Sequence, residues 1–167
     1  MEEIKKACSF TGHRTLKEEH IGKLPALLGR AINYAYENGC RDFLSGGALG
    51  FDTVAAREVL RFRMFHRDVR LILVLPCINQ DEKWSNSQRN AYHHLLGSAD
   101  EIIYVADEYE PGCHKKRNEI LAERGDVIIS YVSRYNSGAA QTVRMAEKLG
   151  KTVYNLYPTL DRELTEK

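Results

Sequence analysis

The sequence has no long apolar run and almost no net charge, and both absences narrow the class of protein. No stretch approaches the roughly 20 apolar residues of a membrane-spanning helix, so we expect no membrane partner. The opening Met-Glu-Glu-Ile-Lys-Lys does not resemble a secretory signal peptide. The formal net charge is only +1, so the basic excess typical of nucleic-acid-binding proteins is missing. Composition therefore argues against a nucleic-acid partner.

Paired cysteines and clustered metal ligands are also missing. The four cysteines are scattered, without a Cys-x-x-Cys pair. Cys8 and Cys77 fall in or beside predicted buried strands, as reduced structural thiols commonly do. No convincing set of metal ligands surrounds the histidines, which include His66, His93, His94 and His114. We therefore predict no metal site and a cytoplasmic location.

The remaining composition is that of a folded globular chain. Hydrophobic residues make up 43% and charged residues 28% of 167 residues, which suits one domain over residues 1–167. The charged tail from about residue 158 is expected to be frayed.

Apolar runs alternate with segments of helical periodicity along the whole chain. We predict strands at 7–10, 42–45, 70–75, 101–105, 126–131 and 152–156. Between them, helices are predicted at 17–38, 53–65, 81–96, 114–124 and 139–149. This alternation indicates an α/β fold with an open, mainly parallel sheet and helices on both faces. The aliphatic character of the first three strands places them near the centre of the sheet.

A glycine-rich turn at residues 45–52 lies between the second strand and the following helix. Gly46 and Gly47 would let a ligand approach the backbone closely, and a helix start presents free N–H groups to a phosphate. The spacing is neither Gly-x-Gly-x-x-Gly nor a P-loop, whose Lys-Ser/Thr is absent. A ligand site and a purely structural turn both remain open at this point.

Ligands of such folds bind outside the carboxyl ends of the strands. The loops expected there are 11–14, 45–52, 76–84, 106–117 and 133–142. Arg14 and Arg117 would meet phosphate, glycine N–H groups would add donors, and Asp52 would cap a ribose hydroxyl or orient Arg14.

Each of these side chains also has a simpler interpretation. Arg14 could pair with a glutamate of the next helix, and Asp52 could serve only as a first-turn helix acid. Arg117 could be an exposed charge of the Lys-Lys-Arg run. Trp84 could pack in the core or stack on a base.

Three segments together resemble a known family. Residues 11–14 (Thr-Gly-His-Arg), 45–52 (Ser-Gly-Gly-Ala-Leu-Gly-Phe-Asp) and 116–118 (Lys-Arg-Asn) look like the signature segments of the YpsA-like family. That family belongs to the SLOG superfamily of Rossmann-like domains, and the resemblance runs from about Cys8 to Pro158. It implies a pocket for a nucleotide or an ADP-ribose-like derivative, and a role in bacterial stress or cell division.

The superfamily also includes the Lonely Guy phosphoribohydrolases, which cleave nucleoside monophosphates, and DNA-processing proteins, which bind single strands. The resemblance aligns Arg117 with the catalytic arginine of the Lonely Guy enzymes. Their catalytic glutamate falls on or beside Arg144, where a cation would repel an oxocarbenium-like centre. This chain also has Ser-Gly-Ala-Ala-Gln-Thr at 137–142 where the YpsA-like pattern has Gly-Gly-Thr.

The sequence thus predicts a nucleotide-binding sensor or regulator without turnover and without a required cofactor. The alternative is a nucleoside monophosphate N-glycosidic hydrolase with an acid drawn from Asp52, Glu108 or Glu110. Single-stranded DNA binding is a weaker alternative, and a homodimer is left open. The candidate ligand-binding residues are Thr11, Gly12, His13, Arg14, Ser45, Gly46, Gly47, Gly50, Asp52, Arg117, Asn118, Ser137, Gly138 and Thr142.

Overall fold

Parallel strand pairing organises the molecule. The structure, a computed structural model, describes residues 5–165. Within them, every pairing of the six-stranded sheet is parallel, and the strand order is β4-β3-β2-β1-β5-β6. The strands are β1 (Lys6–Gly12), β2 (Cys40–Ser45), β3 (Arg70–Cys77), β4 (Glu101–Ala106), β5 (Val127–Tyr131) and β6 (Thr152–Asn155). The predicted Rossmann-like α/β fold is confirmed, with the first three strands inside the sheet.

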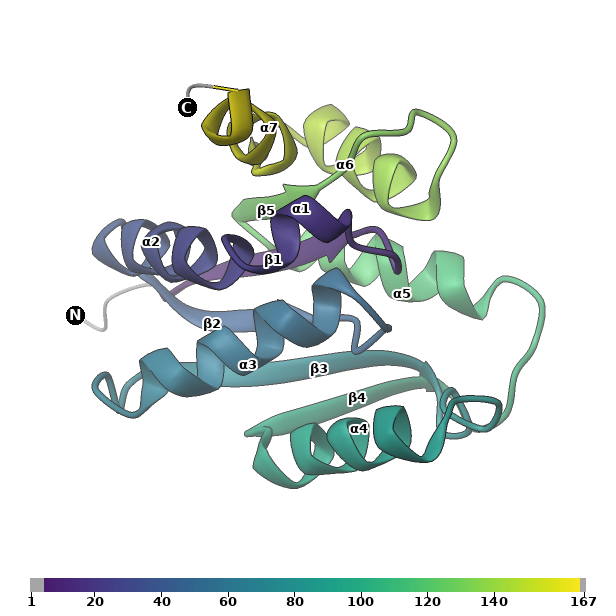
Figure 1. Cartoon of the computed structure of the whole chain (residues 1–167). Helices are drawn as coiled ribbons and strands as arrows, with labels where there is room; N and C mark the ends of the chain where they lie inside the picture. The colour runs from purple at the N-terminus through teal and green to yellow at the C-terminus, as the bar shows by residue number, and fades with distance from the viewer. Residues whose placement is uncertain (1–4, 166–167) are drawn as a thin grey trace.

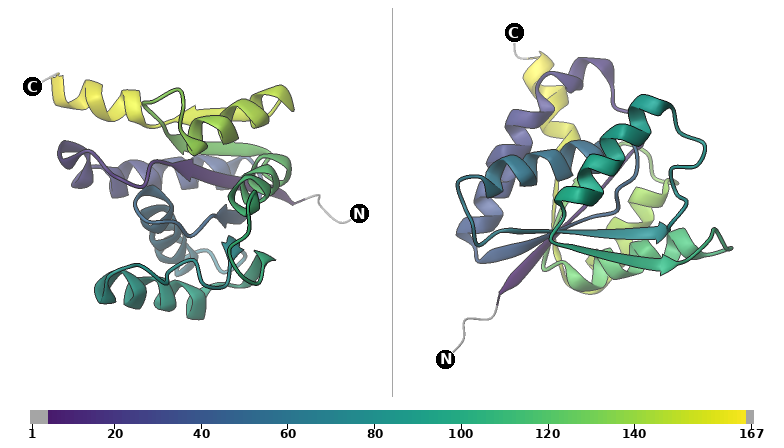
Figure 2. Two further views of the ribbon diagram at one scale, coloured as in Figure 1. Left: turned by 90° about the vertical axis from the view of Figure 1, so that its right-hand side faces the viewer. Right: turned by 90° about the horizontal axis from the view of Figure 1, so that it is seen from below.

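Helices cover both faces of this sheet. Figure 1 shows α2, α3 and α4 in front of the strands, and Figure 2 shows them on the side opposite α5 and α6. The helices are α1 (Glu18–Ile21), α2 (Leu24–Glu37), α3 (Phe51–Arg63), α4 (Asn86–Ser98), α5 (Cys113–Arg124), α6 (Gly138–Lys148) and α7 (Tyr157–Thr165). None of these helices in the described part of the chain has the length and apolar character needed to cross a membrane.

The chain reverses its direction across the sheet at β1. Strands β1 to β4 follow one another toward one edge, and β5 then pairs with the other side of β1. The loops after β1 and β5 therefore diverge from neighbouring strands to opposite faces of the sheet. Such a switch point leaves a crevice at the carboxyl ends of the strands, which is where ligands bind in doubly wound folds.

The alternation of side chains along β3 divides the core between the two faces. Leu71, Leu73 and Leu75 are fully buried in the large cluster that includes residues of α2 and α3. Ile72 and Val74 face the other way and pack with Leu121 of α5 in a second cluster. This two-sided burial explains why the strand is an uninterrupted aliphatic run.

Two predicted helices differ in the structure from what the periodicity suggested. The helix expected over 17–38 is divided, because α1 ends at Ile21 and α2 starts at Leu24, with a proline in its first turn. The helix expected from residue 81 starts at Asn86, where Ser85 and Gln88 form a capping box. Turns occupy most of the segment before it, so that segment is free to border a cavity.

The expectation of a frayed tail from residue 158 is wrong for its described part, which forms α7. Leu160 is fully buried in the core cluster. The buried ring of His20 hydrogen-bonds through Nδ1 to the Tyr131 hydroxyl and through Nε2 to Asp161 Oδ1, both at 2.7 Å. These long-range contacts dock α7 against α1 and β5, which composition alone could not reveal.

Gly50 is required by the backbone at the start of α3. Its φ is 81° and ψ is −124°, and a Cβ there would collide with the carbonyl oxygen of Arg14. We expect Gly50→Ala to lower the free energy of unfolding by about 1–3 kcal/mol, because this conformation is restricted to glycine. The control is Gly97 in α4, where a Cβ meets nothing within 4 Å. Urea denaturation should show Gly97→Ala slightly stabilised, by about 0.5–1 kcal/mol. An equal change in the free energy of unfolding in both variants would show that the backbone does not require glycine at position 50.

Candidate functional site

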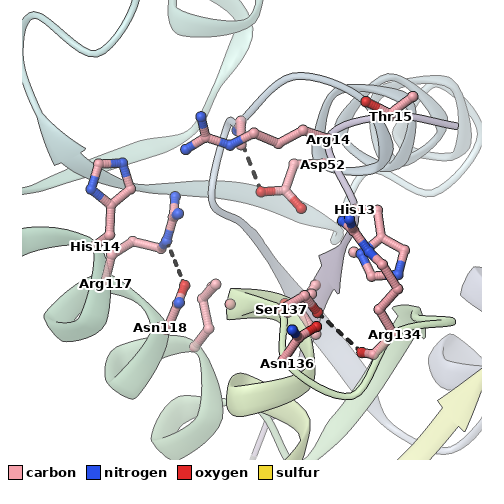
Figure 3. Close-up of a pocket in the computed structure, with 16 residues that line it drawn as sticks. His13, Arg14, Thr15, Asp52, His114, Arg117, Asn118, Arg134, Asn136 and Ser137 are labelled. Carbon is pink, nitrogen blue, oxygen red and sulfur yellow. Dashed lines mark hydrogen bonds between the residues drawn. The ribbon is translucent and has the colours of Figure 1, made fainter.

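A cavity of about 550 Å³ opens at the switch point between β1 and β5. Its walls come from the loop after β1, the loop after β5, the start of α3 and the first turns of α5 and α6. Figure 3 shows the side chains of Arg14, Asp52, Arg117 and Arg134 around it. Residues more than a hundred positions apart in the chain thus share one site.

Three arginines give this cavity its charge. Arg14 and Arg134 are exposed at its edge, whereas Arg117 is only 6% exposed. Arg117 donates from Nη1 to the carbonyl oxygen of Gly46 at 2.7 Å and from Nε to Asn118 Oδ1 at 2.8 Å. Among the described residues, none of the three forms a salt bridge with a carboxylate. The simpler interpretation of Arg14 as a helix ion pair is therefore wrong, and the burial of Arg117 shows that it is not an exposed charge.

Asp52 is the one carboxylate that lines the cavity within the described chain, and it is buried. Its Oδ2 accepts a hydrogen bond from the Ala48 N–H at 3.3 Å, while Oδ1 has no hydrogen-bond partner within the described residues. Burial raises the pKa of Asp52 to about 6, against the lowering effects of Arg117, the Ala48 N–H and Arg14. One buried oxygen of this carboxylate is thus without a donor among the described residues, which is unusual for a buried polar atom.

The N-terminus of α6 borders the same space. Ser137 caps the helix by accepting the Ala140 N–H at 3.0 Å, and Gly138 and Ala139 line the cavity. First-turn N–H groups have no acceptor within their own helix and favour an anion. A Cβ on Gly138 would meet only Asn118 Nδ2, at 3.8 Å, so local packing does not require glycine there. Its absent side chain leaves room beside the helix start.

His13 connects the loops that form this wall. Its Nε2 accepts the Ser133 N–H at 2.8 Å, so the proton of the neutral ring is on Nδ1. Burial, and then Arg134, lower the pKa of His13, which favours that neutral form. Its backbone N–H donates to Tyr131 and its carbonyl accepts from Phe51, both at 3.1 Å. His13 therefore holds the β1, β5 and α3 segments together.

Most of the residues predicted for the site do border this cavity. The structure places there Thr11, Gly12, His13, Arg14, Asp52, Arg117, Asn118, Ser137 and Gly138. Gly12 also has a packing role, because a Cβ on it would lie 2.5 Å from the ring of Phe51.

The other predicted residues support the cavity from behind. A Cβ on Gly47 would point into the core, 2.6 Å from Leu75 Cδ2, and Gly47 does not line the cavity. Ser45 is buried and donates to the carbonyl oxygen of Asp52 at 2.9 Å. Gly46, Gly50 and Thr142 likewise do not line the cavity: Gly46 lies against Arg117 and Asp52, Gly50 under Arg14, and Thr142 bonds back to Gly138.

Sequence reasoning missed several lining residues, namely Thr15, Ala48, His114, Leu121, Arg134, Asn136 and Ala139. Arg134 and Asn136 lie within a loop that the sequence does place at the correct edge of the sheet. The sequence signal was only the position of this loop after a predicted strand, whereas the strand order that makes it face the loop after β1 is seen in the structure alone.

Arg144, which aligns with the lost catalytic glutamate, and the candidate acids Glu108 and Glu110 are outside this cavity. Arg144 points to the other side of the loop, where Nη1 donates to the Tyr135 carbonyl at 2.6 Å and the guanidinium lies 4.9 Å from the tyrosine ring centroid. Glu108 and Glu110 are exposed and do not line it. The hypothesis that Arg144 repels a reacting centre therefore has no structural support, and Asp52 is the carboxylate in place. Within residues 5–165, no group of three or more His, Cys, Asp or Glu side chains is arranged to hold a metal ion.

Comparisons with known sequences match one family model and several similar bacterial proteins. The family model YpsA, described as the YspA SLOG family, matches residues 11–158. The SPbeta prophage-derived protein YoqJ of Bacillus subtilis (strain 168) is 31% identical over 163 residues, covering 89% of this chain and 91% of its own length. A UPF0398 protein of Bacillus cereus (strain G9842) is 26% identical, covering 96% of this chain and 94% of that protein.

Solved structures share the fold at low identity. DNA processing protein A from Helicobacter pylori has a TM-score of 0.65 and 21% identity, with 89% of this chain and 63% of that chain covered. DNA processing protein A from Streptococcus pneumoniae has a TM-score of 0.62 and 19% identity, covering 90% of this chain and half of that one (50%). The X-ray structure of TM1055 has a TM-score of 0.55 and 17% identity, covering 89% of this chain and 72% of that one.

Proposed function

This chain belongs to the YspA SLOG family, and from that premise we propose that its switch-point cavity binds a phosphorylated nucleotide derivative of the ADP-ribose type. The protein would act as a sensor or regulator whose output depends on occupancy. The link to bacterial stress or cell division comes from the family resemblance alone.

The observation that carries this proposal is the charge around the cavity. Arg14, Arg117 and Arg134 line it together with the N-terminus of α6, against the single carboxylate of Asp52. Guanidinium groups and free backbone N–H groups are the donors that bind phosphate oxygens in proteins. A neutral or cationic ligand would leave these donors without acceptors.

Asp52 supports the nucleotide part of the proposal. A phosphate alone would be repelled by a carboxylate, whereas a sugar hydroxyl next to the phosphate would donate to the unpaired Oδ1. A ligand with hydroxyl groups beside its phosphate, such as a ribose phosphate, satisfies both requirements. The volume of about 550 Å³ is sufficient for such a group.

We expect removal of the two exposed arginines to weaken binding without unfolding the protein. Arg14→Ser and Arg134→Ser should each raise the dissociation constant for ADP-ribose about 10- to 100-fold, because each loses a charge-assisted hydrogen bond worth about 1.5–3 kcal/mol. Isothermal titration calorimetry measures this, and circular dichroism checks the fold. The control is Lys116→Ser, an exposed cation of α5 that does not line the cavity. Equal affinity for ADP-ribose in all three variants would show that this cavity does not bind the phosphate groups.

A second candidate function is favoured by one observation, the buried Asp52 beside Arg117. A carboxyl group with a pKa of about 6 is suited to general acid–base work near neutral pH. In an N-glycosidic hydrolysis, water would add to the anomeric carbon, the C–N bond would break, and the base would leave with a proton. The sensor proposal expects no release of adenine from AMP. If the unmodified protein releases adenine from AMP, and Asp52→Asn binds AMP without releasing adenine, the protein is a hydrolase instead.

Single-stranded DNA is a competing candidate ligand, and isothermal titration calorimetry tests it in the same way. A single-stranded DNA binding mode is described for the Helicobacter pylori protein. A short oligonucleotide that binds this chain more tightly than ADP-ribose, with loss of binding in Arg14→Ser, would redirect the proposal to nucleic acid. We expect the nucleotide to bind more tightly, because the net charge of +1 provides little attraction for a polyanion.

A further inference from the structure

A second cavity of about 590 Å³ adjoins the first, and the two share Arg14 and His114. The second cavity is over the carboxyl ends of β3 and β4, whereas the first is over β1 and β5. Its remaining wall includes Leu49, Gln80, Trp84 and Tyr109. A ligand held at Arg14 therefore has open space on both sides of the guanidinium.

The second cavity differs from the first in chemistry. Trp84 and Tyr109 bring two aromatic rings to it from different loops, and Leu49 adds an apolar side chain. Its cations, Arg14 and Lys83, are accompanied by the carboxylate of Glu82, so it lacks the concentrated positive charge of the phosphate cavity. Aromatic and apolar walls suit a flat, uncharged group.

Contacts within the protein cover only part of the surface of Trp84 and Tyr109. One side of Trp84 contacts the buried Tyr92, with ring centroids 5.0 Å apart, but Trp84 remains half-buried and borders the cavity. Tyr109 is 65% exposed, and the one ring contact found for it in the described part of the chain is with His114, at 6.1 Å. Its ring is available to a ligand.

Gln80 provides an oriented polar group at the inner side. Its amide nitrogen is 3.3 Å from the Tyr92 hydroxyl and 3.4 Å from the Gly47 carbonyl oxygen. Its Oε1 is buried without a hydrogen-bond partner among the described residues. A base N–H is the kind of donor that this oxygen lacks.

We propose that this second cavity is the subsite for the base of the nucleotide. The ligand would extend across Arg14, with its base beside Trp84 and Tyr109 and its phosphate and terminal sugar in the first cavity. This inference rests on the proposed function and makes it more specific, because the ligand must have two parts joined through phosphate. ADP-ribose has this construction, whereas ribose 5-phosphate would fill the first cavity only.

Trp84 is the sole tryptophan of the chain and borders the second cavity, so tryptophan fluorescence reports on the surroundings of this one residue. We expect saturating ADP-ribose to change this emission and ribose 5-phosphate to bind, by calorimetry, without changing it. Tyr109→Ala should weaken ADP-ribose about 5- to 150-fold, the range for losing one base–aromatic contact, and leave ribose 5-phosphate unaffected. The control Tyr34→Ala removes a half-exposed tyrosine of α2 that lines neither cavity, and should alter neither affinity.

The outcomes separate the two proposals. If ADP-ribose binds in an Arg14-dependent manner but Tyr109→Ala does not weaken it, the base subsite is wrong and the phosphate site stands. Equal weakening of ribose 5-phosphate by Tyr109→Ala would also overturn the base subsite. If neither ADP-ribose nor ribose 5-phosphate binds the unmodified protein, the proposed function fails and this inference fails with it.

Discussion

Replacing Asp52 by asparagine should stabilise the protein at neutral pH while weakening its binding of the nucleotide. The carboxyl group is buried, and its pKa is raised to about 6 in the folded protein, from an ordinary value of 3.8. At a pH between these two pKa values, the folded chain binds more protons than the unfolded chain. The free energy of unfolding therefore falls as pH rises from about 4 to about 6, and above that it stays reduced.

The difference between the two pKa values corresponds to about 3 kcal/mol at neutral pH, an upper bound on what the neutral asparagine would recover. Urea denaturation of the two proteins from pH 4 to pH 8 measures it, and their stability difference should grow with pH until about pH 6 to 7. Glu108→Gln, which neutralises an exposed carboxylate outside the cavity, is the control and should show no such trend. A pH-independent difference for Asp52→Asn would contradict the buried ionisation.

The same substitution should reduce affinity for ADP-ribose about 10- to 100-fold at pH 7.5, where the carboxylate is ionised. A hydrogen bond from a sugar hydroxyl to a charged acceptor contributes about 1.5–3 kcal/mol, and the neutral amide makes a weaker one. Stability gained together with affinity lost is the pattern expected of a group retained for binding.

Replacing Arg117 by methionine should have the opposite effect on stability. The guanidinium satisfies the Gly46 carbonyl oxygen at 2.7 Å, and a buried carbonyl left without a donor costs about 1–3 kcal/mol. Affinity for ADP-ribose should fall at least 10-fold, because a cation inside the cavity is lost. Thermal denaturation and calorimetry measure the two effects. Lys116→Met, the exposed neighbour on α5, is the matched control and should change neither.

The two positions should be coupled. Burial raises the pKa of Asp52 and Arg117 is the main influence that lowers it, so without Arg117 the carboxyl group should titrate at a higher pH. In the double variant, the effects on stability should differ from the sum of the single effects by about 0.5–3 kcal/mol, as for residues that share a network. Simple additivity would show that Asp52 and Arg117 act independently.

Local sequence predicted the elements of this fold well because their signals are local. The aliphatic run of β3 and the glycine-bearing turn before α3 are readable from neighbouring residues. Errors arose where a distant contact decided the outcome. Residues after Pro158 look polar and terminal, yet Leu160 and Asp161 dock on the core and on His20, more than a hundred residues away.

Residue type and spacing by themselves determined that this chain is a doubly wound α/β protein with polar loops along one edge, since hydrophobic period and glycine turns act over a few residues. Only the tertiary structure decided which of those loop residues face the ligand space. Gly47 points into the core at Leu75, Arg144 turns to Tyr135, and Arg134 enters the cavity instead. The direction of a loop side chain depends on the strands packed around it, and those strands are distant in the sequence.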